Sequence, residues 1–220
     1  MMKKLMSIWI ILSIIILTVM VFTINTSFPI FTYVWLIVSL IFLIKQTSRE
    51  LGVKKTTVKK LIKYTLLHFL MLTIIYLIFE PWSNTYKLLI DLAFNSTPAD
   101  PTFVWLNYNR NYFSYLLIFL ITFFITIFGE ELFFRGLLFQ KLKNKVNIIW
   151  TVVIQAALFA LPNTIVAFLM PTNNSIIYIF VYAFLAVGCV GGYTAAKTDS
   201  IWPSLISASI MNLVLVLIYF

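Results

Sequence analysis

Long apolar runs, separated by short polar or basic stretches, recur along the whole 220-residue chain. A helix rises 1.5 Å per residue, so an apolar run of about twenty residues crosses the hydrocarbon core of a bilayer. The pattern predicts an all-α fold, a polytopic transmembrane bundle that forms one domain over residues 1–220. We expect about seven spans, at residues 5–24, 28–44, 64–79, 112–139, 148–170, 176–190 and 201–220.

The stretches between these runs predict how the spans begin and end. A basic loop is expected over Lys45–Lys63, and the longest polar region over Glu80–Asn111. Within that region, Tyr86–Phe94 is expected to form a short helix in the plane of the lipid headgroups. Pro162 is expected to interrupt the fifth span, and Gly191-Gly192 to end the sixth.

Basic residues are distributed unevenly between the two sides of this bundle. With the N-terminus inside, thirteen of the sixteen Lys and Arg residues fall in inside loops and two in outside loops, while Arg135 lies in a span. The positive-inside rule therefore predicts a multi-pass protein of the cell membrane with a cytoplasmic N-terminus and the C-terminus outside. The net charge of +9 then reflects topology rather than nucleic-acid binding, and the bilayer itself is the first expected partner.

Composition narrows the class further. With 62% hydrophobic and 10% charged residues, the chain does not have the make-up of a soluble globular protein. Its single cysteine, Cys189, excludes an intrachain disulfide.

The candidate chemistry lies in the fourth predicted span, in Phe128–Leu138. Only seven residues of the chain are carboxylates, yet Glu130 and Glu131 are adjacent here. Charged groups at membrane depth are costly unless paired, and they usually mark function. On a helix Glu131 and Arg135 are four residues apart and can pair, whereas Glu130 points about 100° away and needs another partner or a proton. A structural ion pair explains Glu131 and Arg135 at least as well as a catalytic role, but it leaves Glu130 unexplained.

Two glycines and two asparagines complete this picture. Gly129 and Gly136 bracket the carboxylates and are expected to let a neighbouring helix approach closely. Helix rise places Glu130 about 16 Å and Asn212 about 18 Å from the inner ends of their spans, with Asn163 deeper in its own span. These depths predict a buried polar pocket open to the inner side, although hydrogen bonding between helices would also explain both asparagines.

The segment Glu130-Glu131-Leu-Phe-Phe-Arg135-Gly136 resembles the Glu-Glu-x-x-x-Arg motif of the CAAX-protease and bacteriocin-processing (CPBP, or Abi) family. These are membrane-embedded endopeptidases of prenylated proteins and bacterial relatives, several of them linked to bacteriocin self-immunity. Two further segments follow in the family's order, one ending at Asn163 and one ending at Asn212, so that the likeness covers about residues 112–216. It implies a CPBP-type fold.

The resemblance implies the site Glu130, Glu131, Arg135, Asn163, Asn212, with Ala208 at the position of a family histidine. Asn163 stands at the position of the other histidine. Asparagine does not shuttle protons near neutral pH, and alanine offers no polar group. Carboxylates and amides are also a poor ligand set for zinc, so no cofactor is expected unless the protein is active.

These departures favour a catalytically impaired pseudoprotease that binds a hydrophobic or lipidated peptide, or acts as a scaffold or regulator of a membrane or cell-envelope protein. One alternative is an active endopeptidase that uses Glu130, and another is a small transporter. The lone histidine, His68, is expected about 7 Å from the inner end of its span, as an interfacial or packing residue rather than a substitute catalyst.

Overall fold

The computed structural model describes residues 51–85, 128–167 and 173–219, and every regular element in these segments is helical. The predicted all-α class is confirmed for this part of the chain. The predicted spans 5–24 and 28–44, the short helix Tyr86–Phe94, and the first part of span 112–139 lie outside the described residues. The elements are α3 (Val58–Ser83), α6 (Phe128–Glu130), η3 (Glu131–Leu138), α7 (Phe139–Leu142), α8 (Ile148–Ala167), α9 (Asn173–Val181), η4 (Tyr182–Val190), α10 (Gly191–Thr198) and α11 (Trp202–Tyr219).

Helix α3 is longer at both ends than the predicted span 64–79. Its first turns include Lys59, Lys60 and Lys63, so the predicted loop over Lys45–Lys63 is wrong for its last residues. Lysine is a good helix former, and its long side chain leaves the ammonium group in water while the backbone is helical. At the other end the helix continues past Glu80 and stops at Asn84, whose left-handed backbone (φ 50°) donates its N–H to the Glu80 carbonyl.

The glycine pair Gly191-Gly192 does not end a helix, contrary to the prediction. Helix α9, the π-helical segment η4 and helix α10 follow one another without a break from Asn173 to Thr198. Both glycines are buried, and a Cβ atom on Gly192 would lie 2.7 Å from Oε1 of Gln155 in α8. These glycines therefore serve close packing between helices, which is their usual role in membrane proteins.

Pro162 does not interrupt helix α8, which runs through it from Ile148 to Ala167. A proline removes one backbone donor from the helix ladder. The carbonyl that loses its donor is that of Leu158, four residues earlier. The next two residues add side-chain bonds to the same turn of the helix: Asn163 Nδ2 donates to the Phe159 carbonyl at 3.0 Å, and Thr164 Oγ1 to the Ala160 carbonyl at 2.8 Å.

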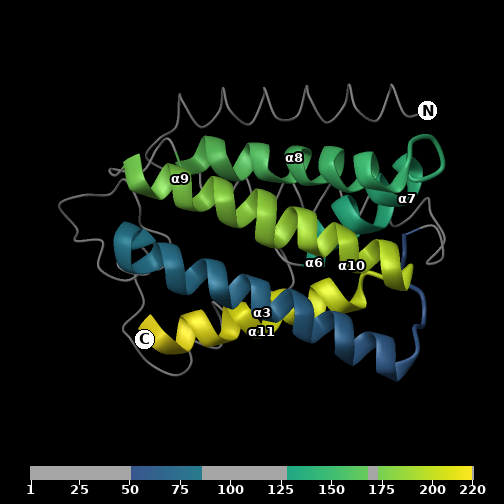
Figure 1. Ribbon diagram of the computed structural model, residues 1–220, viewed down its shortest axis with the longest axis horizontal. Helices are drawn as coiled ribbons and strands as arrows, with labels where there is room; N and C mark the ends of the chain where they lie inside the picture. The colour runs from purple at the N-terminus through teal and green to yellow at the C-terminus, as the bar shows by residue number, and fades with distance from the viewer. Residues whose placement is uncertain (1–50, 86–127, 168–172, 220) are drawn as a thin grey trace.

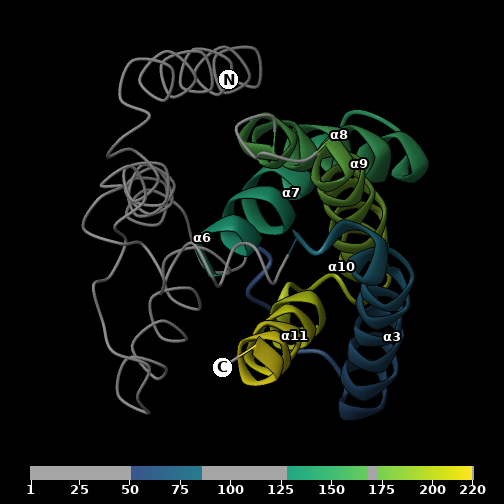
Figure 2. The ribbon, with the colours of Figure 1, turned by 90° about the vertical axis from the view of Figure 1, so that its left-hand side faces the viewer.

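The helices form a bundle in which α3 runs beside the continuous rod of α9, η4 and α10 (Figure 1). Helix α8 packs along η4, and α3 also packs along α11. Turned by 90°, the same arrangement shows α6 and α7, which flank η3 in the sequence, beside α8 and above α11 (Figure 2). One apolar core surrounds η3, and a second joins α3, the α9–η4 rod and α11. The site described below lies where these two cores meet.

Two helices among the described residues are long and apolar enough to cross a membrane, Val58–Ser83 and Asn174–Thr198. Ile148–Leu161 and Trp202–Ile218 are shorter apolar helices. The outer face of α3 is strongly exposed, with Val58 70%, Leu66 60% and Leu77 62% accessible. An exposed apolar face of this length is typical of contact with lipid. The number of spans and the orientation of the termini stay predictions.

The basic segments gather at one end of the bundle, where α3, α8 and α11 begin and α7 and α10 end (Figure 1). Asp199, which follows α10, forms salt bridges with both Lys54 and Lys143. The Ser200 hydroxyl donates to the Lys54 carbonyl at 2.8 Å, and the Ile201 N–H to the Gly52 carbonyl at 3.0 Å. Asp199 thus joins the segments around Lys54 and Lys143 to its own, and the charge pattern predicts all three on the inner side of the membrane.

This junction predicts a modest loss of stability in acid. Partial burial raises the pKa of Asp199, but hydrogen bonds from Lys143 and Lys54, together with their charges, hold it below its usual value. A carboxyl whose pKa is lower in the folded state stabilises the fold above its unfolded pKa, near 3.9, and loses this contribution as pH falls through the folded value. Because the Asp199 side chain is 46% exposed, we expect less than about 1 kcal/mol.

Thermal unfolding of the detergent-solubilised protein from pH 7 to pH 3 measures this effect. Asp199→Asn keeps a residue that tolerates the left-handed backbone (φ 53°) and should reduce the fall in melting temperature at low pH. Lys145→Gln, at an exposed position, is the control and should show the same fall in melting temperature as the unaltered chain. An equal fall in Asp199→Asn and in the unaltered chain contradicts the assignment.

Candidate functional site

The motif Glu131–Arg135 lies on the π-helical segment η3, whose eight residues are all buried. Arg135 Nη1 lies 3.2 Å from Glu131 Oε1, so the predicted ion pair is confirmed. The backbone is wound more widely than the α-helix from which the pairing was predicted, and π-helical turns are frequent at functional sites. A spacing of four residues keeps the two side chains on one face in either geometry.

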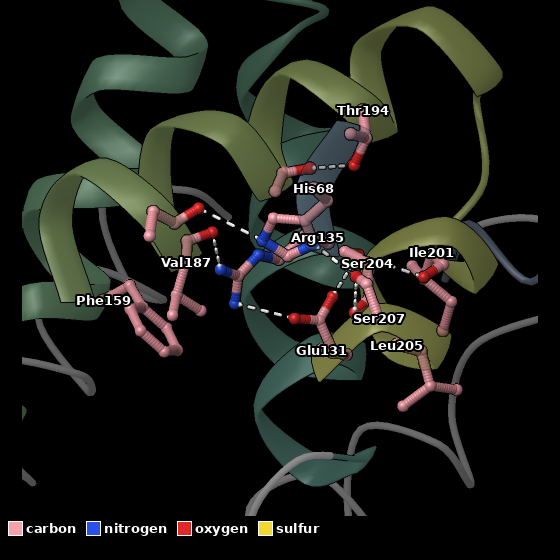
Figure 3. Close-up of polar contacts among 12 residues, drawn as sticks. His68, Glu131, Arg135, Phe159, Val187, Thr194, Ile201, Ser204, Leu205 and Ser207 are labelled. Carbon is pink, nitrogen blue, oxygen red and sulfur yellow. Dashed lines mark hydrogen bonds and ion pairs between the residues drawn. The ribbon is translucent and has the colours of Figure 1, made fainter. Parts of the chain in front are cut away.

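Each member of the pair has a further partner from another helix (Figure 3). The Ser204 hydroxyl of α11 donates to Glu131 Oε2, and Arg135 Nη2 donates to the Val187 carbonyl of η4. The Arg135 guanidinium also lies 4.3 Å from the centre of the Phe159 ring of α8. Glu131 is 2% exposed and Arg135 0% exposed. Both charges are therefore desolvated and held by contacts from three surrounding elements.

His68 of α3 belongs to the same buried cluster, which the sequence did not predict. Its Nδ1 lies 2.6 Å from the Ser207 hydroxyl of α11, and its Nε2 3.1 Å from the Ala186 carbonyl of η4. A carbonyl only accepts, so we assign the proton to Nε2 and let Nδ1 accept from Ser207. With 0% exposure, His68 is a packing residue, one of the two roles expected for it. It lies about 15 Å from the start of its helix, farther than expected, because α3 begins at Val58.

Two glycines let these side chains and the chain around them approach closely. A Cβ on Gly191 would lie 3.1 Å from Arg135 Nη2 and 3.4 Å from His68 Cε1, so the missing side chain makes room for both. A Cβ on Gly136 would collide with the backbone carbonyl of Leu51. The predicted close approach at Gly136 is thus confirmed, but the neighbour is the segment before α3 rather than a helix.

The remaining predicted site residues lie outside this hydrogen-bonded cluster. Glu130 is partly buried and directly precedes η3. The amide N–H of Asn163 donates to the Phe159 carbonyl of its own helix, so this bond is intrahelical rather than between helices. Ala208 and Asn212 lie one and two turns beyond Ser204 along α11, and the Asn212 amide nitrogen has no acceptor among the described residues.

The residues do not fit a zinc ion. Within residues 51–85, 128–167 and 173–219, no three His, Cys, Asp or Glu side chains are grouped to hold a metal. Both His68 nitrogens are occupied by Ser207 and Ala186, and both Glu131 oxygens face Ser204 or Arg135. Zinc prefers histidine and cysteine ligands, and Ala208 offers no donor atom.

Two helices long and apolar enough to cross a membrane, together with a buried carboxylate–guanidinium pair, are typical of integral membrane proteins of the all-helical class. Comparison with known families gives a narrower likeness: residues 112–214 match the model of the family described as type II CAAX prenyl endopeptidase Rce1-like. Over these residues the chain is similar to that family, and the resemblance stated from Glu130, Glu131 and Arg135 is confirmed. The matched region is slightly less than half of the 220 residues. No curated protein and no solved structure matched the chain.

Proposed function

We propose that this protein is a pseudoprotease that binds a hydrophobic or lipidated peptide, or a membrane or cell-envelope protein, without cutting it. The observation that supports this most directly is the engagement of His68, the one histidine of the sequence. Its two ring nitrogens are bonded to Ser207 and Ala186 in a site that is closed to solvent, so it is not free to transfer protons for Glu130. Glu131 is held by Arg135 and Ser204 and does not replace Glu130 as a base.

The other motif positions support the same proposal. Ala208 replaces a proton-transfer group by a methyl group, and Asn163 donates to its own helix instead of facing a substrate. His68 accepts from the Ser207 hydroxyl and donates to the Ala186 carbonyl, so both ring nitrogens are used in contacts of α3 with η4 and α11. Glu130 is then the motif carboxylate through which a bound peptide is recognised, as a hydrogen-bond acceptor or, when protonated, as a donor.

An active endopeptidase is the second candidate, favoured by the match of residues 112–214 to an endopeptidase family. In that case Glu130 would act as the base. A positioned acid or base is typically worth about 10²–10⁴-fold in rate. Under both candidates we place the protein in the cell membrane with several spans and a cytoplasmic N-terminus, as the charge pattern predicts.

Cleavage and binding are measured together on the full-length protein in detergent. We expect a farnesylated C-terminal peptide to bind more tightly than the same peptide without the farnesyl group, and neither peptide to be cleaved. Glu130→Gln should weaken binding modestly and leave the fold intact, while Lys145→Gln, at an exposed position outside the motif, is the control. Cleavage that disappears in Glu130→Gln would establish the endopeptidase instead. Equal binding of the two peptides would remove lipidated peptides as the partner.

A further inference from the structure

A second cluster of side chains lies on the outer surface, between α3 and α10 near the basic end of the bundle. The rings of Tyr64 and Tyr193 meet edge to face, with centres 6.2 Å apart. Lys63 Nζ lies 5.6 Å from the centre of the Tyr64 ring, and Lys197 Nζ 5.5 Å from that of Tyr193. We call these four residues the Lys–Tyr ladder. It joins two helices whose ladder residues are more than a hundred positions apart.

The surroundings of the ladder carry a large excess of positive charge. Residues 51–63, 141–145 and 191–199 hold nine lysines and one carboxylate, Asp199. That carboxylate is engaged by Lys54 and Lys143. In the described part of the chain, Lys63 and Lys197 have no carboxylate partner, and both are exposed. A ring attracts an ammonium group without neutralising it, so the three donors of each lysine stay available to an anion.

The ladder also borders an apolar surface. Tyr193 is 43% exposed, and one turn along α3 from Lys63 the side chain of Leu67 is 36% exposed, followed by Leu70 at 55%. Tyrosine favours the level of the lipid headgroups, where its ring is apolar and its hydroxyl is hydrated. Anion-binding lysines on the basic end and exposed leucines toward the middle of the bundle match a molecule with an anionic head and hydrocarbon tails.

We propose that the Lys–Tyr ladder binds an anionic phospholipid, with the phosphate between Lys63 and Lys197. The acyl chains then lie along the exposed face of α3. Basic pockets between membrane helices are well suited to such headgroups, because each lysine near the surface adds attraction. The tyrosine pair holds the two lysines on neighbouring helices, so binding also ties α3 to α10. This site is separate from Glu130 and does not depend on the proposed peptide binding.

The test uses full-length protein in detergent and short-chain lipids as probes. Dihexanoyl phosphatidylglycerol should raise the melting temperature at lower concentrations than dihexanoyl phosphatidylcholine, and native mass spectrometry should show it retained. Lys63→Gln with Lys197→Gln should raise the half-effective concentration of phosphatidylglycerol by about tenfold or more. The matched control, Lys55→Gln with Lys145→Gln, removes the same charge from exposed positions at the same end.

Three results would overturn the proposal. Equal weakening by the two double variants would show diffuse attraction to the basic end rather than a site at the ladder. Full stabilisation by glycerol 3-phosphate would show a site for soluble anions. Unchanged phosphatidylglycerol affinity in Tyr193→Leu would show that the ring pair does not organise the lysines. A selective loss in the Lys63/Lys197 variant, with a smaller loss in Tyr193→Leu, supports the phospholipid site.

Discussion

Replacing Arg135 with alanine is expected to destabilise the protein by about 3–5 kcal/mol, the usual cost of removing one partner of a buried ion pair. The substitution would leave the buried Glu131 carboxylate with the Ser204 hydroxyl and without its counter-charge. It would also remove the side-chain donor to the Val187 carbonyl, which keeps the Gly191 N–H, and empty the space against the Phe159 ring. The measurement is the melting temperature and the yield of folded protein in detergent.

A double-mutant cycle separates the ion pair from the lost packing. Glu131→Gln removes the stranded charge, so adding it to Arg135→Ala should recover part of the loss. Glu130→Gln is the adjacent control and should cost less than either single change at the pair, because Glu130 has no part in the Arg135 contacts. If Arg135→Ala and Glu130→Gln have equal and negligible effects, the pair does not support the fold.

His68→Ala is expected to cost about 2–4 kcal/mol, from a cavity and from buried groups that lose a partner. The imidazole fills the space where α3, η4 and α11 meet, and both of its nitrogens are bonded there. Leu66→Ala, on the same helix but 60% exposed, is the matched control and should have a small effect. Detergent melting temperatures compare the two variants, and a larger loss for Leu66→Ala would contradict the position of His68.

His68 and Arg135 are neighbours, so their contributions are expected to be coupled. Gly191 packs against both side chains, which places the histidine and the guanidinium on one small surface of α10. Residues in contact commonly show non-additive effects. The cluster is therefore best regarded as one unit that holds the motif helix against α3 and α11.

Local features of the chain were sufficient for the helical class and for the ion pair. Apolar runs of about twenty residues indicate helices because a membrane leaves no other way to satisfy the backbone. The pairing of Glu131 with Arg135 follows from their separation along one helix, and neighbouring positions interact whatever else surrounds them. The family likeness depends on the same short stretch, and residues 112–214 bear it out.

Helix limits were predicted less well because Gly, Pro and Lys have opposite effects in different surroundings. Gly191-Gly192 usually signals a helix end, yet here it lies inside a continuous rod where α8 packs closely. Lys59 and Lys63 suggested a loop, but they lie in the first turns of α3. Because the helix starts earlier than expected, His68 lies farther from its beginning than the sequence predicted.

By itself the sequence determined what is local: an apolar helical protein and a buried carboxylate–guanidinium pair. The tertiary structure alone decided which residues complete the cluster. Ser204 reaches Glu131 from 73 positions away, and Ser207 reaches His68 from 139 positions away. No spacing rule relates such positions, because the contact depends on which face of each helix is packed and on the level at which two helices meet.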